Sequence, residues 1–171
     1  MASMKLSAIS LLVLPAVCLG GTEYLNPDFV EDTTPWAEIA ASLPAYPKNE
    51  NLVPLAASSA TGNKFMIDTA SVSVGKDGVV RYTVVIESPR GARTVNYEGL
   101  RCETAERKIY GFGQPDGKWT ENRRAAWESI KLRSLLSYHK PLFEGIFCEL
   151  GIPVRDAEAG VRRLKQSAGS W

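Results

Sequence analysis

The sequence predicts an α+β fold: an antiparallel β-meander of four to five strands with helices packed on one face, preceded by an extended N-terminal arm. Between residues 64 and 119, short stretches rich in β-branched and aromatic residues alternate with tight-turn sequences. From residue 121 onward, apolar residues recur at helical spacing instead. Because strands joined by tight turns pair antiparallel, we expect a meander.

Residues 1–20 have the three parts of a secretory signal peptide. Lys5 is the only charge before Glu23, residues 6–14 are apolar apart from two serines, and small residues follow Pro15. The apolar stretch is shorter than the roughly 20 residues that cross a bilayer. We therefore expect secretion across an inner membrane into a periplasm; the alternative is a buried N-terminal helix.

Cys18 introduces a second possibility, a lipid anchor on its thiol that would hold the mature chain at a membrane. A lipobox places a small residue directly before the cysteine, and here the bulky Val17 occupies that position. We therefore expect a cleaved chain, with lipidation at Cys18 as the alternative.

Residues 21–63 are interpreted as an acidic arm and linker. Residues 22–47 hold five acids and no base, whereas the chain after them holds 19 of the 20 bases and 14 of the 19 acids, a net charge of 19 − 14 = +5. Five prolines exclude a long helix, but Pro35–Ala40 predicts a short one whose Trp36 and Ile39 face the domain. The charge asymmetry predicts an arm that lies on its own domain; the alternative is a solvated arm.

The domain core is assigned to residues 64–150. Its strands are expected at residues 65–67, 71–74, 79–87, 92–102 and 108–112. In the strongest of them, residues 79–87, the side chains that share one face are Val80, Tyr82, Val84 and Ile86. The turns are expected at Gly75–Gly78, Ser88–Gly91 and Pro115–Gly117.

Apolar residues between 121 and 148 predict a helix that covers one face of this sheet. Its apolar stripe includes Leu135, His139, Leu142 and Ile146. Pro141 is expected to kink or divide the helix. A short basic helix is expected at residues 156–166, within a C-terminal tail of residues 151–171.

Two cysteines, Cys102 and Cys148, lie beyond the leader. In an oxidising compartment they predict one disulfide, between the end of a strand and the end of the long helix. The alternatives are two buried free thiols or two metal ligands. A metal site requires further ligands at short spacing, and the sequence has one histidine, so we expect no metal and no cofactor.

His139 is the one candidate general base of its type. Its place on the apolar stripe favours a core histidine with a satisfied hydrogen bond, and no nucleophile or phosphate-loop motif accompanies it. A small periplasmic enzyme using His139 is therefore an alternative, and it predicts a concave pocket with His139 in its wall.

Arginines and aromatic residues are interleaved in the core segment. Arg90, Arg93, Arg123 and Arg124 are candidates for binding an anionic component of the envelope, which requires them to converge on one face. The modest net charge and the interleaved acids favour an ordinary solvated surface and disfavour nucleic acid as a partner.

A series of short segments carries a family resemblance. They are Val79–Tyr82, Ser88–Ala92, Asn96–Cys102, Tyr110–Phe112, Trp127, Tyr138–His139 and Phe147–Cys148. Together they resemble the CNP-like family of exported proteobacterial proteins of unknown function, over about residues 23–150. The resemblance implies a periplasmic or envelope location. Some members look like lipoproteins, but this sequence departs from that subset because its lipobox is weak. The family has no assigned reaction, so the resemblance assigns no catalytic residue.

These observations favour a non-enzymatic envelope protein that binds a partner or helps to maintain the envelope, with its biochemical function otherwise unknown. The partner could be an envelope protein or an anionic envelope component. Such a surface is expected to show as an exposed apolar or aromatic patch of a few hundred Å².

Overall fold

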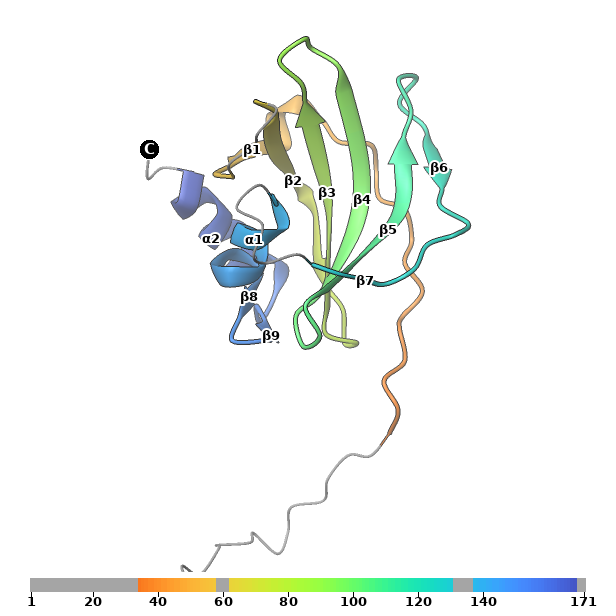
Figure 1. Ribbon diagram of the computed structural model, residues 1–171, viewed down its shortest axis with the longest axis vertical. Coiled ribbons are helices and arrows are strands. Elements are labelled where there is room, and N and C mark those ends of the chain that lie inside the picture. The colour runs from red at the N-terminus through yellow and green to blue at the C-terminus, as the bar shows by residue number, and fades with distance from the viewer. Residues whose placement is uncertain (1–33, 58–61, 131–136, 169–171) are drawn as a thin grey trace, which may run out of the picture. The chain divides into compact units, whose positions relative to one another are not determined.

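The computed structural model describes residues 34–57, 62–130 and 137–168, and from Trp36 onward the chain forms one compact unit. Its main sheet is antiparallel, in the sequential order β1-β2-β3-β4-β5-β6 (Figure 1). These strands are β1 (Leu52–Leu55), β2 (Lys64–Val74), β3 (Val79–Glu87), β4 (Arg93–Arg101), β5 (Glu106–Gly113) and β6 (Trp119–Glu121). A short β7 (Glu128–Ser129) also pairs with β5. The predicted α+β meander is confirmed.

The sheet is larger than predicted at both edges. β1 follows a 3-10 turn, η1 (Asn49–Asn51), and comes from the segment that the sequence assigned to the linker. β2 is one strand of 11 residues rather than two short ones. Its register against β3 shifts between Asp68 and Ser73, where the small residues Thr69, Ala70 and Ser71 interrupt the pattern of large apolar residues. A β-bulge of this kind bends a strand without ending it.

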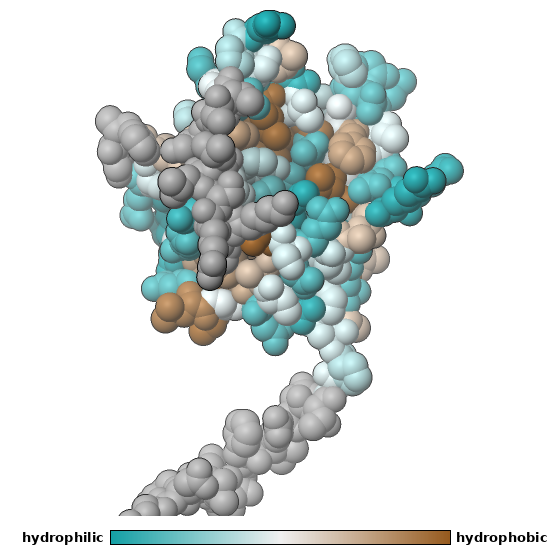
Figure 2. Space-filling view, viewed as in Figure 1, coloured by the Kyte–Doolittle hydropathy of each residue, from teal (hydrophilic) through white to brown (hydrophobic). Residues whose placement is uncertain are grey.

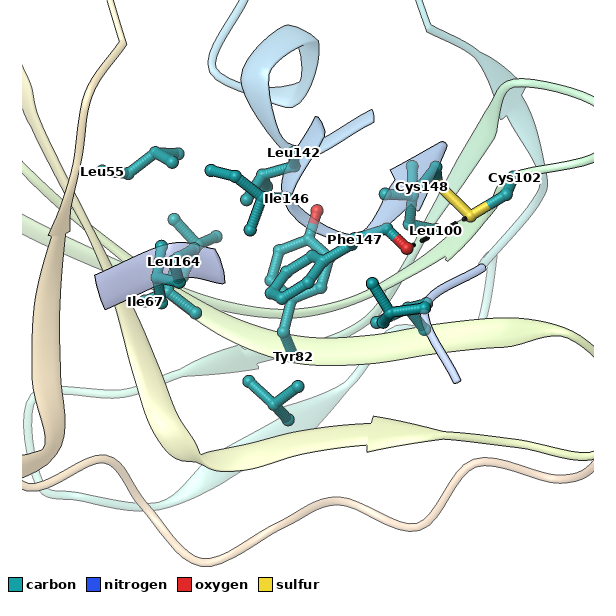
Figure 3. Close-up of a cluster of buried hydrophobic side chains, with 14 of the residues drawn as sticks. Leu55, Ile67, Tyr82, Leu100, Cys102, Leu142, Ile146, Phe147, Cys148 and Leu164 are labelled. Carbon is teal, nitrogen blue, oxygen red and sulfur yellow. Dashed lines mark hydrogen bonds between the residues drawn. A yellow bond between two sulfur atoms is a disulfide. The ribbon is translucent and has the colours of Figure 1, made fainter. Parts of the chain in front are cut away.

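One face of the sheet packs against the C-terminal third of the chain and forms the main core. Its largest fully buried members are Tyr82, Phe147, Ile67, Leu100, Leu142 and Leu164. The rings of Tyr82 and Phe147 lie 5.2 Å apart at the centre of this cluster (Figure 3). Val80 and Val84, predicted to share the face of Tyr82, belong to the same cluster.

The second face of the sheet is covered as well, which the alternating pattern did not predict. Val79, Arg81, Thr83 and Val85 point away from the main core, yet all four are buried. The cover is residues 36–48, an extended segment that we call the strap; it crosses the sheet on the side opposite the helices (Figure 1). The predicted helix at Pro35–Ala40 is therefore wrong.

The reason is where the strap's backbone groups are bonded. The N–H of Ile39 donates to the Asp77 carboxylate (2.8 Å), and its carbonyl accepts from the Arg81 guanidinium (2.7 Å). Both groups would otherwise be available for a helix, so these contacts with the sheet override the local helix signal. Two glycines of β5 make room for the strap: a Cβ on Gly111 would lie 2.7 Å from Leu43, and one on Gly113 2.9 Å from Tyr46.

The long helix expected between residues 121 and 148 is wrong over its first part, residues 121–130. Residues 122–130 run along the open edge of β5: the N–H of Asn122 donates to the Tyr110 carbonyl (2.7 Å) and that of Ile130 to the Ala105 carbonyl (2.8 Å). Sheet pairing therefore takes the backbone groups that a helix would need. Residues 131–136 lie outside the described part of the chain.

After residue 136, the first helical element is α1 (His139–Pro141), which continues into a π-helical turn, η2 (Leu142–Ile146). The hairpin of β8 (Cys148–Glu149) and β9 (Ile152–Pro153) follows, and then the predicted C-terminal helix, α2 (Ala157–Ala168). Asp156 caps α2, because its carboxylate accepts from the N–H of Ala159 (2.8 Å). Among the described residues, no helix has the length and apolar character needed to cross a membrane.

Candidate functional site

The strap is held through one carboxylate. Glu38 accepts hydrogen bonds from Lys108 Nζ (2.8 Å), the Tyr110 hydroxyl (2.8 Å) and Trp127 Nε1 (3.2 Å). Burial alone would raise the pKa of the Glu38 carboxyl, but these donors, together with the charge of Lys108, lower it below its ordinary value. Of the five acids in residues 22–47, Glu38 is the one that lies within the described residues, and its carboxylate bonds to the sheet.

A second group of contacts, centred on Asp77 and Arg81, holds the start of the strap. Asp77, at the β2–β3 turn, and Arg81 of β3 form a buried ion pair (2.6 Å). Burial would raise the pKa of the Asp77 carboxyl, but the Arg81 guanidinium and the N–H groups of Ile39 and Val79 lower it. Trp36 Nε1 donates to the Asp77 carbonyl (2.8 Å). The strap is thus held both through its backbone, at Ile39, and through its side chains, at Trp36 and Glu38.

Aromatic side chains hold the end of the strap by hydrogen bonds. Trp119 Nε1 donates to the Pro44 carbonyl (2.8 Å), and the Tyr46 hydroxyl donates to the Gln114 carbonyl (2.9 Å). The rings of Tyr46 and Trp119 lie 5.6 Å apart. With the contacts of Trp36, Glu38 and Ile39, these bonds hold the strap at both of its ends.

Three large side chains of the strap are apolar and exposed. We call Trp36, Ile39 and Leu43 the ridge; Ile39 is 48% exposed, and the other two are also exposed. The Arg101 guanidinium lies 3.9 Å from the Trp36 ring, and Trp127 meets that ring edge-on at 6.0 Å. Trp36 and Ile39 were predicted to face the domain. Both residues contact it, but their side chains remain exposed.

A hollow of about 320 Å³ lies beside the ridge. Its lining comprises Glu38, Ala40, Ala41, Leu43, Lys108, Tyr110, Glu121, Asn122 and Ala125. Lys108 and Tyr110 already donate hydrogen bonds to Glu38 there. Leu43 belongs to both the ridge and the hollow, so exposed apolar side chains and polar groups adjoin on this surface.

His139 lies elsewhere, in a buried polar cluster under α1. Glu98 Oε1 accepts from the Tyr138 hydroxyl (2.7 Å) and Asn96 Nδ2 (3.2 Å), while Oε2 contacts His139 Nε2 (2.9 Å) and the Tyr82 hydroxyl (3.1 Å). Burial would raise the pKa of Glu98, but hydrogen bonds from these partners, with His139 first, lower it. Because an ionised carboxylate only accepts, His139 Nε2 donates.

His139 is therefore a buried histidine whose Nε2 is bonded to the Glu98 carboxylate. The residue is 7% exposed. Over the described ranges, the hollows along α2, β1, the β8–β9 hairpin and the strap do not include it in their linings. The pocket that an enzyme using His139 would require is therefore not present at those places.

The four candidate arginines lie in two separate pairs. Arg90 is in the β3–β4 turn, and Arg93, which begins β4, donates to Asn49 (3.1 Å). Arg123 and Arg124 follow Asn122, which is bonded to Ile109 and Tyr110 of β5. Counted along the strands through the β4–β5 register, Arg93 and Tyr110 lie five residues apart, which is about 15 Å. They are also separated in the direction across the strands, so the two pairs of arginines lie apart.

Cys102 and Cys148 form a disulfide, with their Cα atoms 5.6 Å apart. The bond joins the end of β4 to the start of the β8–β9 hairpin (Figure 3), so the alternatives of free thiols and of metal ligands are wrong. The predicted signal peptide, residues 1–20, and Cys18 within it lie outside the described residues.

The sequence did not single out Glu38 or the exposed hairpin residue Leu150. Glu98 carried a signal that could have been used. It alternates with Asn96 and Leu100 on the face that β4 turns to the core, opposite Tyr82 of the neighbouring strand. An acid at such a position requires partners, and Tyr138 and His139 were the polar residues of the opposing segment.

The structure defines a disulfide-bonded α+β domain whose antiparallel meander carries helices on one face and an N-terminal strap on the other. The sequence pattern of the CNP1-like family matches residues 31–165, and the chain belongs to that family. Cryptic neisserial protein 1 of Neisseria gonorrhoeae (strain ATCC 700825 / FA 1090) is 28% identical over 121 residues. That match covers 63% of this chain and 59% of the relative's length. No solved structure matches this chain.

Proposed function

We propose that this protein is exported to the periplasm and acts there as a binding protein of the cell envelope, with the ridge as its contact surface. The export step is supported by the signal-like residues 1–20 and by the disulfide, since structural disulfides persist mainly in oxidising compartments. The partner class that fits is an envelope protein with an apolar groove.

The observation that carries the binding role is the ridge itself. Trp36, Ile39 and Leu43 remain exposed on the strap, although Trp36 Nε1 bonds to Asp77 and Leu43 lies close to Gly111. Exposed apolar side chains gathered in one place, beside a hollow that also holds polar groups, are typical of interaction sites. An apolar groove on a partner would bury them.

The export step is tested by the intact mass of the protein recovered from the cell envelope, with thiols alkylated before and after reduction. We expect the loss of about twenty residues by signal cleavage, and Cys102 and Cys148 blocked until reduction. A chain that begins at Cys18 with added lipid would show the anchored form instead. An uncleaved chain with free thiols would contradict export.

The contact surface is tested by a photo-crosslinking amino acid placed at Ile39 in cells. The matched control position is Asp116, which is exposed in the β5–β6 turn, away from the ridge. We expect a discrete crosslinked species from position 39 that is absent from position 116 and is lost when Leu43 is replaced by Asn. Equal crosslinking at both positions would remove the ridge as the contact surface.

A further inference from the structure

The turn of the β8–β9 hairpin is built from residues that do not suit it. Leu150 and Gly151 form a two-residue connection in which both have positive φ, 50° and 80°. This conformation prefers Asn-Gly or Asp-Gly, because a larger side chain at the first position crowds the backbone. A leucine there costs about 1–2 kcal/mol.

The same leucine gains nothing from packing. Leu150 is 97% exposed and Ile152, two residues later, is 67% exposed; they are the most exposed large apolar side chains of the described residues. Figure 2 shows hydrophobic surface standing out at the β8–β9 hairpin. A side chain that is both strained and exposed does not stabilise the fold, so its presence indicates a contact outside the chain.

The base of the hairpin is fixed. Cys148, its first residue, is bonded to Cys102, and Val154, which directly follows the hairpin, is buried and donates its N–H to the Phe147 carbonyl (2.9 Å). The two aliphatic side chains are thus presented on a short, anchored projection, which lowers the entropy cost of binding.

Three guanidinium groups gather beside this projection. A hollow of about 380 Å³ is lined by Arg155, Arg162 and Arg163 together with apolar and amide groups. A second hollow, of about 270 Å³, joins Arg155 and Arg163 to Leu150 and Ile152. The arrangement is a pair of aliphatic side chains at the tip with cations at their base.

Each of these arginines has an acidic neighbour, but the pairs are on the surface. Arg155 pairs with Asp156, Arg162 with Glu158 and Arg163 with Glu149. Surface pairs of this kind contribute little free energy, and a guanidinium has five N–H donors, so capacity remains for an anion. Residues 149–166 hold four bases and three acids, a net charge of 4 − 3 = +1.

We infer that the β8–β9 tip inserts into the surface of an anionic phospholipid bilayer, with Leu150 and Ile152 at the acyl boundary and the arginines at the lipid phosphates. Two side chains on a convex tip bury far less area than the roughly 800 Å² per partner of a stable protein interface. A bilayer accepts a small apolar projection without a matching cavity. This surface is distinct from the ridge, so the inference stands apart from the proposed function.

The inference is tested by co-sedimentation of the disulfide-bonded protein, as recovered from the envelope, with vesicles of phosphatidylglycerol and phosphatidylcholine. Leu150→Asn relieves the strained turn, so it should not lower stability, but it should reduce partitioning about tenfold or more. Ile152→Thr should reduce it in the same direction. The matched control is Ile39→Asn, an equivalent change on the ridge, which should leave partitioning unchanged.

The arginines have a separate signature. Arg155→Gln combined with Arg162→Gln should weaken binding to vesicles that contain phosphatidylglycerol and leave binding to pure phosphatidylcholine unchanged. All variants share the same N-terminus, so differences between them report the tip and not the leader. Wild-type partitioning that Leu150→Asn does not alter would overturn the inference. So would a wild-type protein that ignores vesicles but loses a protein partner on the same substitution.

Discussion

Glu98 is a fully buried carboxylate whose two oxygens are satisfied by four side chains from β3, β4 and the start of α1. Glu98→Gln keeps the shape but places an amide donor against groups that themselves donate. We expect the free energy of unfolding to fall by about 3 kcal/mol, measured by urea denaturation. Tyr82→Phe is the matched control: it removes one hydrogen bond and keeps the ring, and should cost about 1 kcal/mol.

The ionisation of Glu98 also predicts a pH dependence. Its pKa is lower in the folded state than in the unfolded chain, so ionisation stabilises the fold above the unfolded pKa of about 4.3. This stability is lost as the pH falls through the folded value. The stability difference between wild type and Glu98→Gln should therefore be constant from pH 7 to 5.5 and shrink below pH 4.5. A difference that stayed constant to pH 3 would contradict the ionised cluster.

At the scale of elements, the disulfide has the clearest expected effect. It closes a loop of 46 positions between the end of β4 and the start of the β8–β9 hairpin. Replacing both Cys102 and Cys148 with serine should lower the free energy of unfolding by about 4 kcal/mol in the chain-entropy treatment. Reduction of the wild type should reproduce most of this loss in a thermal melt. An unchanged melt after full reduction would show that helix packing alone holds the hairpin.

The strands and the C-terminal helix could be predicted from the sequence because their signals are local. Val79–Glu87 has β-branched and aromatic residues between two turn sequences, and α2 has Asp156 as its cap. The failures share one cause. At Ile39 and at Asn122, hydrogen bonds to partners distant along the chain take the backbone groups that a local helix would use.

The candidate surfaces were less predictable for the same reason. Glu38 lies 70 residues from Lys108 and 89 from Trp127, and single-sequence patterns carry no information on such pairs. Leu150-Gly151 did lie in the sequence as an apolar residue before a turn glycine. Its meaning depended on the positive φ of Leu150 and on its exposure, which only the folded chain shows.

At the scale of the whole molecule, the domain has three layers: helices, sheet and strap. β3 lies at the centre of this arrangement, paired with β2 and β4 and buried on both faces over most of its length. The strap is held mostly by hydrogen bonds, to its backbone and to its side chains, and much of its outer surface is solvated. Its loss should therefore cost less free energy than unfolding of the sheet.

Hydrogen exchange measures this hierarchy directly. We expect the amides of β3 to exchange only through global unfolding. The Ile39 amide should exchange through a local opening of lower free energy that releases the strap alone. Glu38→Gln weakens the contacts with Lys108, Tyr110 and Trp127 and should raise the Ile39 exchange rate about fivefold, since a hydrogen bond contributes about 1 kcal/mol. The matched control is Glu121→Gln, which lines the same hollow without bonding to the strap in the described residues. If Glu38→Gln accelerated β3 and Ile39 equally, the strap and sheet would be one cooperative unit, and the ridge would be a fixed part of the domain surface rather than a separable layer.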